Sequence, residues 1–388
     1  MTGEKFFDYI RLAIEKLLKS KGKRIILVHH DDADGLASAS ILSASLQSEG
    51  FEVERICLEK LFPEVLERIH QETNSVIIYA DIGSGQVERI SSLNKRRNLT
   101  IILDHHDTKH VKDDSVLNVN PELFGFEGET DASGSVVSYL FAKALNKENE
   151  KLAYIALIGA QELPSKTSGR LTRIPFEDAS KSGQIKQNKI VKLNISFSSA
   201  FRNLQILGPV GYYKNGPDIG VNACLEGFSD DVKKLIESLE EERKTKTKRV
   251  LGMLYRKGLN HTEHVQWFDV GNMFDGLGTK VIGTFCSYLS YQRIVDPKKY
   301  ILGMMNVRKE IPGFGRLEKD YVKVSSRLPK LLRDEVERGK AKPLSYLLPA
   351  SCEDVGGFGD GHKYAASGIF PSDKKGEFIQ AFERRINE

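Results

Sequence analysis

The feature that most constrains the fold of this chain is an alternation between short β-branched runs and longer helical stretches, which begins near Arg24. Apolar runs bounded by polar or glycine-containing turns predict strands, and they occur at Arg24–His29, Phe51–Cys57, Ser75–Asp81 and Leu99–Leu103. Stretches with helical character follow at Leu36–Glu49, at Leu61–Thr73 and at about Ser133 to Leu145. This alternation is typical of an α/β fold in which helices cover a parallel sheet.

A chain of 388 residues is long enough for two or three domains. Between Ser229 and Lys257, acidic residues are followed by basic ones, which predicts a long exposed helix. A second set of strands and helices follows that helix. We therefore expect an α/β domain at 1–200, a connector containing the long helix at 201–259, and a smaller α/β domain at 260–388, with a cleft between the domains.

Composition excludes several classes of protein. With 40% hydrophobic and 28% charged residues, the chain resembles a soluble globular protein, and no apolar run reaches the length of about 18 residues that a membrane span needs. The stretch Met1–Lys23 has the pattern of an amphipathic helix and not of a signal peptide, so we expect a cytoplasmic protein. The four cysteines are far apart and without CxxC spacing, which favours reduced, buried thiols.

The net charge of +4 is too small to indicate nucleic-acid binding by itself, so local clusters must decide. Residues 164–192 are rich in lysine and arginine, against only Glu177 and Asp178. Two interpretations remain open for this segment. It is either a solvated excursion with ordinary surface lysines or a flank that contacts phosphates.

The first strand is followed directly by His29-His30-Asp31-Asp32-Ala33-Asp34-Gly35. Alternate residues at the end of an extended segment point to the same side, so His30, Asp32 and Asp34 can converge. Ligands packed so densely repel one another unless a cation lies between them. The alternative is an acidic turn in which an aspartate caps the following helix.

Two further strands end in residues of the same kind. Asp81 ends the third predicted strand, and Asp104-His105-His106-Asp107 follows Leu99–Leu103. In an open α/β sheet, ligands bind beyond the carboxyl ends of the strands, so three such junctions together indicate a metal centre. Mixed imidazole and carboxylate ligands suit ions such as Mn²⁺, whereas oxygen ligands alone suit Mg²⁺.

These motifs resemble those of the DHH phosphoesterases, whose third motif corresponds to Asp104-His105-His106. The glycine-rich segment Gly356–Gly368 resembles the GGGHxxAAG motif of the family's DHHA1-type C-terminal domain, and Ser325-Ser326-Arg327 resembles the VSxR strand that precedes it. Because both halves match in the same order, the resemblance covers nearly the whole chain. Within the family, the stretch Asp178–Leu204 is most similar to archaeal RecJ-like nucleases.

The resemblance implies a two-cation site that hydrolyses phosphodiesters. In it, His30 and Asp32 hold one ion and Asp34 the other, while Asp81 bridges the two and His105 completes the ligand set. His106 then lies behind the ligands or near the scissile phosphate. The implied catalytic residues are Asp104, His105 and His106. Such a site needs no serine or cysteine nucleophile, because two cations about 3.5–4 Å apart activate water.

The chain departs from the family pattern at its fourth motif, which normally supplies a metal-binding aspartate. The matching stretch is Ala156–Leu163, in which Leu163 occupies the position of that aspartate. The adjacent Glu162 is one methylene longer and is the candidate replacement. Without it, one cation loses an anionic ligand, and the activity is in doubt more than the fold.

The C-terminal glycines allow backbone N–H groups to approach an anion closely, although a glycine-rich surface turn is the alternative. The candidate substrate-binding residues are Ser326, Arg327, Gly359, Gly361, His362 and Lys363. Tyr288, Tyr291 and Phe314 are candidates for stacking on bases. By contrast, we interpret His261-Thr262-Glu263-His264 as structural, because no third ligand is apparent, and Trp267 and Phe268 as core residues.

The sequence thus predicts a Mn²⁺- or Mg²⁺-dependent RecJ-like exonuclease with two ions that acts on single-stranded DNA or RNA, as in DNA repair or replication. Two alternatives remain. The first is a catalytically weakened DHH-fold scaffold in a replication or repair complex, with GINS or a helicase as partner. The second is a phosphodiesterase for nano-RNA or cyclic dinucleotides.

Overall fold

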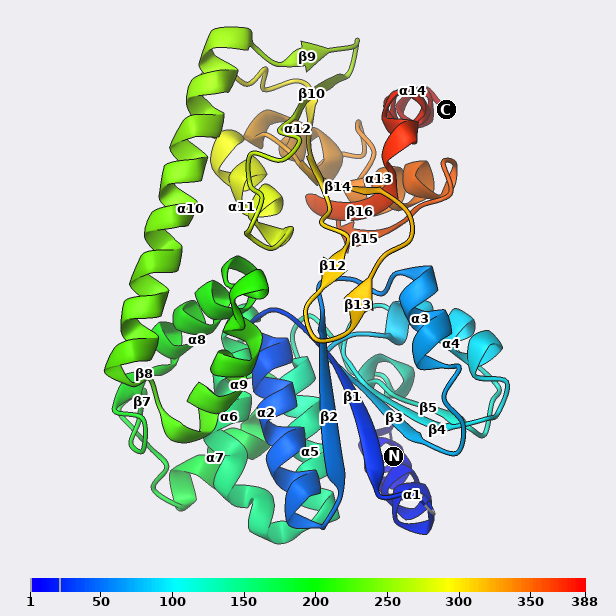
Figure 1. Cartoon of the computed structure of the whole chain (residues 1–388), viewed down its shortest axis with the longest axis vertical. Helices are drawn as coiled ribbons and strands as arrows, with labels where there is room; N and C mark the ends of the chain where they lie inside the picture. Colours follow the sequence, from blue (N-terminus) through cyan, green and yellow to red (C-terminus); the bar gives the residue numbers. More distant parts are fainter. Residues whose placement is uncertain (1, 21) are drawn as a thin grey trace. The chain divides into compact units, whose positions relative to one another are not determined.

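The computed structural model describes residues 2–20 and 22–388, which divide into two units (Figure 1). The first unit runs to Glu237 and includes Pro312–Phe314, and the second comprises Ser238–Ile311 and Gly315–Glu388. Residues 201–237, expected in the connector, therefore pack with the first unit, and the boundary falls within the long helix α10 (Asp230–Lys257). The helix expected over Met1–Lys23 is α1 (Thr2–Lys19), and Met1 and Lys21 lie outside the described residues.

Over the described residues, the first unit is built on a five-stranded parallel sheet of order β2-β1-β3-β4-β5. Its strands are β1 (Arg24–His30), β2 (Glu52–Leu58), β3 (Val76–Ala80), β4 (Leu99–Leu103) and β5 (Val116–Val119). The chain moves to one side from β1 to β2 and then returns to place β3 on the other side. The carboxyl ends of β1 and β3 therefore form a topological switch point, where open α/β sheets bind their ligands.

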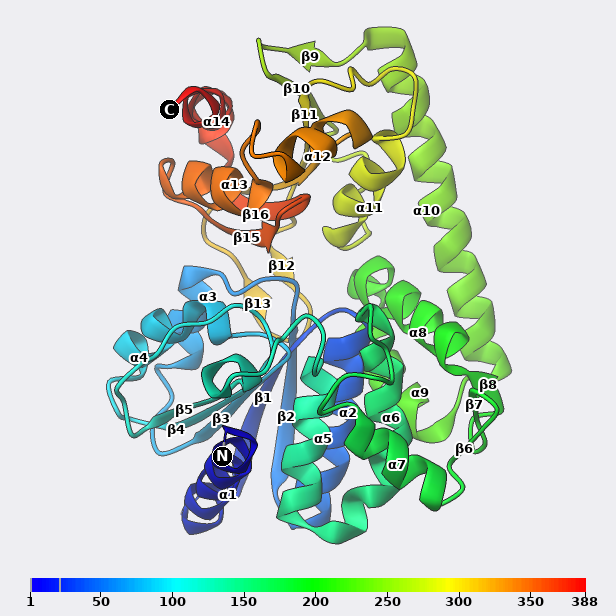
Figure 2. The same ribbon diagram turned by 180° about the vertical axis from the view of Figure 1, so that it is seen from behind.

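Helices cover both faces of this sheet, with α2 and α5 on one face and α3 and α4 on the other (Figures 1 and 2). The helices are α2 (Ala33–Ser48), α3 (Pro63–Ile69), α4 (Val87–Asn94), α5 (Gly134–Leu145), α6 (Ala153–Gly159), α7 (Arg173–Lys181), α8 (Phe197–Gln205) and α9 (Gly216–Glu226). Helix α2 is buried almost throughout, because it packs on β1 and is surrounded by α5, α6 and α9. Its run of Ala, Ser and Leu suits this position, since small side chains allow close helix packing.

The predicted strands and helices are largely confirmed, with shifts at their ends. Helix α2 begins at Ala33 and not at Leu36, because Asp32 caps it. The sequence analysis missed α4 and β5, which are short and carry weak periodicity. The basic run at 164–192 forms α7 and a small antiparallel sheet of β6 (Ile185–Lys186), β7 (Lys189–Ile190) and β8 (Ile195–Ser196), on which the lysines are exposed.

The second unit is built on a sheet of order β15-β16-β14-β11-β10-β9 within the described residues, in which only β10 and β11 pair in parallel. Its elements are β9 (Asn260–His261), β10 (Val265–Asp269), α11 (Lys280–Leu289), β11 (Tyr300–Asn306), the hairpin of β12 (Glu310–Ile311) and β13 (Gly315–Arg316), β14 (Tyr321–Arg327), α12 (Lys330–Glu337), α13 (Leu344–Glu353), β15 (Phe358–His362), β16 (Ala365–Pro371) and α14 (Lys375–Asn387). An apolar core joins the sheet to α12, α13 and α14. The predicted α/β fold class is confirmed, and no helix in the described ranges is long and apolar enough to cross a membrane.

Candidate metal centre

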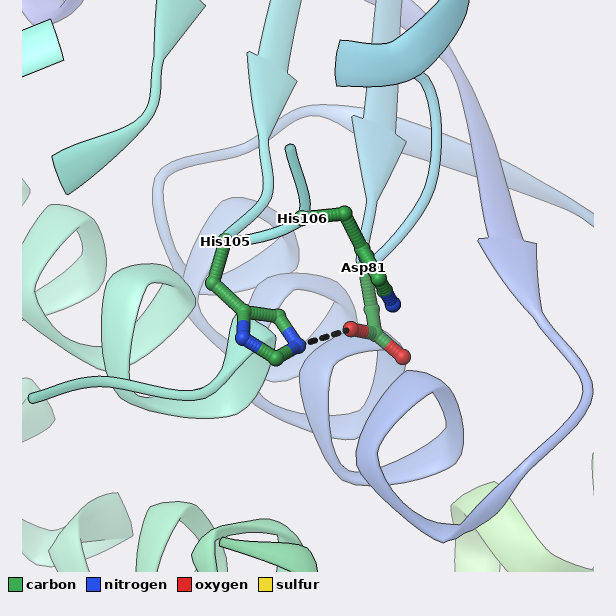
Figure 3. A group of neighbouring side chains, drawn as sticks. All are labelled: Asp81, His105 and His106. Atoms are coloured by element: carbon green, nitrogen blue, oxygen red, sulfur yellow. Dashed lines mark ion pairs between the residues drawn. The ribbon is translucent and has the colours of Figure 1, made fainter. Parts of the chain in front are cut away.

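The carboxyl ends of β1, β3 and β4 bring acidic and imidazole side chains to one edge of the sheet. His30 is the last residue of β1, and Asp81 directly follows the last residue of β3. His105 lies two residues beyond the end of β4, and its ring points toward Asp81 (Figure 3). Because these strands are parallel neighbours, their ends meet at the switch point, and the structure brings the predicted junctions together.

Asp32 uses its two carboxylate oxygens for different purposes. Oδ1 accepts a hydrogen bond of 3.0 Å from the backbone N–H of Gly35 and so caps α2. Oδ2 lies 3.0 Å from His30 Nδ1. The helix-cap and ligand interpretations of this motif are therefore compatible. Gly35 is needed here because a Cβ would lie 2.4 Å from the carbonyl oxygen of His30.

Asp81 occupies the middle of the centre. Its backbone has a φ of 60°, a left-handed conformation that aspartate tolerates better than most residues. The side chain is 1% exposed, and within the described part of the chain neither carboxylate oxygen meets a hydrogen-bond partner. Oδ2 faces His30 Nδ1 at 3.7 Å, and Oδ1 faces His105 Nε2 at 3.5 Å. A buried carboxylate without hydrogen bonds is costly unless a cation neutralises it, so this donor set fits a metal ion.

The tautomer of His105 is fixed from behind. Its Nδ1 lies 2.8 Å from the carbonyl oxygen of Gly128, to which it donates, so Nε2 carries the lone pair. Nε2 faces three carboxylates, at 3.3 Å from Glu162 Oε1, 3.5 Å from Asp81 Oδ1 and 3.9 Å from Asp34 Oδ2. An imidazole held in this way is prepared to ligate a cation.

The carboxylates change the acidity of both histidines. Burial opposes the charged form of His30, but the neighbouring Asp32, Asp81 and Asp31 outweigh it and raise its pKa to about 10. Burial likewise opposes the charged form of His105, but its carboxylate neighbours raise its pKa well above the ordinary value. A proton and a cation compete for the same nitrogen lone pair, so cation binding at these histidines releases protons.

Asp34 is held by the amino-terminal turn of α5. Ser133 Oγ donates to Oδ1 at 2.9 Å, Gly134 N to Oδ2 at 2.6 Å and Ser135 N to Oδ1 at 3.1 Å. Burial, followed by the neighbouring carboxylates, raises the pKa of Asp34 well above its ordinary value. On the other side, a Cβ at Gly159 would lie 2.0 Å from Asp34 Oδ1, so only glycine fits at that position.

Glu162 reaches the centre, whereas Leu163 does not take part in it. Glu162 ends the short 3₁₀ turn Ala160–Glu162 that follows α6, and its Oε1 lies 3.3 Å from His105 Nε2. Leu163 is 4% exposed and belongs to the apolar core. The Glu162 carboxylate therefore lies within reach of the centre, and its role as the replacement for the aspartate missing at position 163 stays a prediction.

The candidate ligands form overlapping groups that share Asp81. Within each group, one candidate ligand atom per residue lies within 4.8 Å of the others. The groups are His30, Asp32 and Asp81; Asp34, Asp81, His105 and Glu162; and Asp81, His105 and His106. The first two of these groups are joined by the single carboxylate of Asp81, which matches the arrangement expected for a pair of cations.

Asp104 supports the centre from behind. Its Oδ2 accepts from the Ser84 backbone N–H at 2.9 Å, and its Oδ1 accepts from His105 N at 2.7 Å, His106 N at 3.3 Å and His106 Nδ1 at 2.7 Å. Burial raises the pKa of Asp104, but His106 and the backbone donors outweigh it, so the pKa lies far below the ordinary value. Asp104 thus orients the half-exposed His106 and is not itself a member of the ligand groups, while the catalytic role expected for it stays a prediction.

In the second unit, the expected substrate-binding residues of β14 differ in exposure. Ser326 is fully buried, and its hydroxyl donates to the carbonyl of Ile301, so its side chain supports the sheet and is not available to a ligand. Arg327 donates from Nε to Ser287 Oγ at 2.8 Å and from Nη1 to Ser325 Oγ at 3.2 Å. Burial lowers the pKa of this guanidinium, which its polar contacts keep in place.

The glycine-rich segment Gly356–Gly368 begins in a turn after α13, forms the edge strand β15 and continues through a hairpin turn into β16. Gly359 and Gly361 lie in β15, which pairs with β16 and forms an edge of the sheet. A Cβ at Gly359 would lie 3.1 Å from Leu348 of α13, so this glycine also permits helix packing. His362 and Lys363 are exposed at the end of the hairpin, where Lys363 Nζ lies 2.9 Å from Glu337.

The groups that position the ligands are those that the sequence analysis missed. Most are backbone atoms, such as the Gly128 carbonyl and the N–H groups of Gly134 and Ser135. The sequence Ser133-Gly134-Ser135 before an apolar helical run is the available signal, since it is typical of a helix start. A third partner for the His264 motif was also missed: Glu383 accepts from His264 Nδ1 at 2.7 Å and anchors that loop.

Taken together, the doubly wound sheet and its carboxylate–histidine cluster define a two-unit α/β protein with a candidate metal centre at the switch point. Residues 24–160 match the family model described as "DHH family, N-terminal domain". This part of the chain is therefore a DHH-family N-terminal domain, and the chain has a RecJ-like fold. The resemblance inferred from the motifs is thereby confirmed.

Similarity to individual proteins extends over most of the chain. Protein MJ0831 of Methanocaldococcus jannaschii is 25% identical, over 96% of this chain and 95% of the relative. A prophage-derived protein of Bacillus subtilis, YorK, whose name describes a single-strand DNA-specific exonuclease, is 26% identical over 39% of this chain and 27% of its own length. The fold is similar to that of RecJ from Thermus thermophilus in complex with Mn²⁺, with a TM-score of 0.66, 16% identity and coverage of 98% of this chain and 54% of that one.

Proposed function

We propose that this protein is a divalent-metal-dependent phosphodiesterase, and specifically a RecJ-like exonuclease that hydrolyses single-stranded DNA or RNA from an end. The observation that carries the proposal is the position of Asp81, a buried carboxylate that belongs to all three overlapping candidate ligand groups and has no hydrogen-bond partner in the described ranges. Membership of the DHH family supports phosphoester hydrolysis. The name of YorK supports a single strand as substrate.

The ligand groups fit a pair of Mn²⁺ or Mg²⁺ ions, which, when bound, activate water and neutralise charge on the phosphate. One group, His30 with Asp32 and Asp81, would hold one ion. The other, Asp34 with Asp81, His105 and Glu162, would hold the second. Imidazole nitrogen in both groups favours Mn²⁺ over Mg²⁺.

The remaining groups orient the ligands and the substrate. Gly128 holds the ring of His105 through its carbonyl. Asp104 holds His106 through Nδ1, and this half-exposed ring lies beside Asp81 and His105, where it would contact a phosphate oxygen. Nucleophilic catalysis by cysteine is disfavoured, because burial raises the pKa of all four thiols.

The test is hydrolysis of a single strand by the purified full chain. With Mn²⁺, we expect end-labelled single-stranded DNA or RNA to be shortened, and we expect Asp81→Asn to abolish this activity and most Mn²⁺ binding. Asp231→Asn is the matched control, since Asp231 is 95% exposed on α10. Undiminished hydrolysis by Asp81→Asn would refute the proposed centre.

A second candidate function is a DHH-fold scaffold in a replication or repair complex, with GINS or a helicase as partner. The observation that favours it is Leu163 at the position of the family's metal-binding aspartate. The number of bound ions separates the two functions. Two Mn²⁺ ions per chain support the hydrolase, and none supports the scaffold.

A further inference from the structure

Four tyrosines are exposed among the described residues of the second unit, and three of them lie on or next to α10 and α11. Tyr255 on α10 is 54% exposed, Tyr288 on α11 is 46% exposed, and Tyr291 just beyond α11 is 74% exposed. Thr284 and Tyr288 lie one turn apart on α11, Tyr291 follows in the turn after the helix, and all three are exposed. This face of α11 is therefore polar and aromatic and takes no part in the core.

The three tyrosines belong to one surface. The hydroxyl of Tyr255 lies 3.5 Å from Oε1 of Gln292, which places the end of α10 beside the end of α11, as both views show (Figures 1 and 2). Tyr288 is supported from below by Phe285, whose ring centroid is 6.4 Å away. Phe285 in turn packs edge-on against Phe268 in the core. The rings are thus presented from a rigid base.

The two chain segments that carry the tyrosines are basic. Residues 243–262 contain seven lysines and arginines and no acidic residue, and residues 276–295 contain two and none. Several of these cations are exposed and, over the residues that the structure describes, form no ion pair. They are Lys248, Arg249, Arg256, Lys257 and Arg293. A surface with free cations between exposed aromatic rings complements a polyanion that carries flat, stackable groups.

The helix surface beside Tyr255 is unusually open. Gly252 lies about one turn before Tyr255, near the carboxyl end of α10, and a Cβ there would meet nothing within 4 Å. No packing contact therefore requires glycine at this position, although glycine within a helix costs about 1 kcal/mol relative to alanine. The missing side chain leaves the helix surface one turn before Tyr255 clear.

We propose that the tyrosine surface formed by Tyr255, Tyr288 and Tyr291 binds single-stranded nucleic acid by stacking its bases, while the surrounding lysines and arginines contact its phosphates. This inference rests on the proposed function, because it assigns a binding site for the same class of substrate. Single strands fit better than duplexes, since only unpaired bases expose faces that can stack on tyrosine.

The experiment measures binding of fluorescein-labelled oligothymidylate of about 20 nucleotides to the full chain in EDTA, by fluorescence anisotropy. We expect Tyr288→Ala and Tyr291→Ala each to weaken binding about 5-fold or more. Tyr346→Ala is the matched control, because Tyr346 is 47% exposed on α13 in the same unit. Circular dichroism of each variant verifies that it is folded.

A second measurement tests the phosphate contacts through salt dependence. We expect Lys248→Gln and Arg256→Gln each to reduce the slope of log K against log salt by about 0.7. Lys234→Gln is the control, since Lys234 is 76% exposed near the other end of α10. Unchanged slopes in the first two variants would count against the inference.

The outcomes separate this inference from the proposed function. If the tyrosine variants bind oligothymidylate as well as the unaltered chain does, the tyrosine surface is not a stacking site for nucleic acid. The same conclusion follows if polyglutamate displaces the labelled oligothymidylate as well as unlabelled oligothymidylate does, because polyglutamate has no bases to stack. Hydrolysis of a dinucleotide with Mn²⁺ reports on the metal centre alone. If binding depends on the tyrosines but no dinucleotide is hydrolysed, the binding surface is supported and the proposed nuclease function is refuted.

Discussion

Replacing Asp104 by asparagine tests whether this residue positions His106 or ligates a cation itself. The carboxylate accepts four hydrogen bonds, three on Oδ1 from the two histidines and one on Oδ2 from Ser84 N. An asparagine that keeps its oxygen toward the histidines retains those three, so this orientation is preferred. Its NH₂ group then faces the buried N–H of Ser84, and both donors lack an acceptor.

The size of the effect follows from this count. A buried N–H without an acceptor costs about 1–3 kcal/mol, and the retained hydrogen bonds weaken because their acceptor is no longer charged. We therefore expect Asp104→Asn to lower the free energy of unfolding by about 2–4 kcal/mol, which most domains survive. Because partners that orient a catalytic imidazole contribute about 10–100-fold, we expect hydrolysis to slow by that factor.

The assay combines urea unfolding, Mn²⁺ titration by calorimetry and single-strand hydrolysis. A positioning role predicts slower hydrolysis with the number of bound ions unchanged. Asp107→Asn is the matched control, since Asp107 is an exposed carboxylate in the same loop. If Asp104→Asn instead lost an ion, or if hydrolysis were unaffected, the reasoning would be wrong.

Three further predictions concern the centre itself. Gly134→Ala would place a Cβ 2.5 Å from Asp81 Oδ1, so we expect the Mn²⁺ affinity measured by calorimetry to fall about 10-fold or more. Gly252→Ala is the control and should leave the affinity unchanged, because a Cβ at Gly252 meets nothing within 4 Å. Glu162→Gln removes an anionic ligand from one group only, so equilibrium dialysis should show about one Mn²⁺ fewer per chain, and an unchanged count would exclude Glu162 as a ligand. Folding raises the pKa of His30 from 6.5 to about 10, so in EDTA its contribution to the free energy of unfolding is complete below pH 6.5 and is lost as the pH rises toward 10. Mn²⁺ affinity should rise over the same pH range, because the proton on His30 is lost. Urea unfolding and calorimetry measure the two quantities, and a free energy of unfolding and an affinity that both stayed constant would contradict this prediction.

The sequence predicted those parts of the fold that rest on apolar pattern. Strands β1, β3 and β4 were found because β-branched runs between turns leave few alternatives. Strand β5 (VLNV) was missed, since four residues with a polar one among them do not establish a period. The start of α2 was placed too late, because the capping side chain Asp32 also belongs to the metal-binding motif.

The candidate centre was predicted through its side chains but not through its supports. The strand-end position of Asp81 gave a weak signal alone, and its central place depends on the order of strands, which no local pattern encodes. The Gly128 carbonyl that fixes His105 carries no side-chain signal at all. For Glu162, the sequence could name the candidate but could not decide its reach, because this depends on the 3₁₀ turn after α6.

We expect the glycines whose backbone packs closely against the candidate ligands to limit the size of the ion that the centre can accept. Backbone at Gly35, Gly134 and Gly159 leaves no room for even a methyl group beside His30, Asp81 and Asp34. Calcium needs six to eight oxygens at about 2.3–2.6 Å, a wide and deformable shell that such walls do not permit. Because Ca²⁺ is the larger ion, we expect excess Ca²⁺ to leave Mn²⁺ bound at this centre.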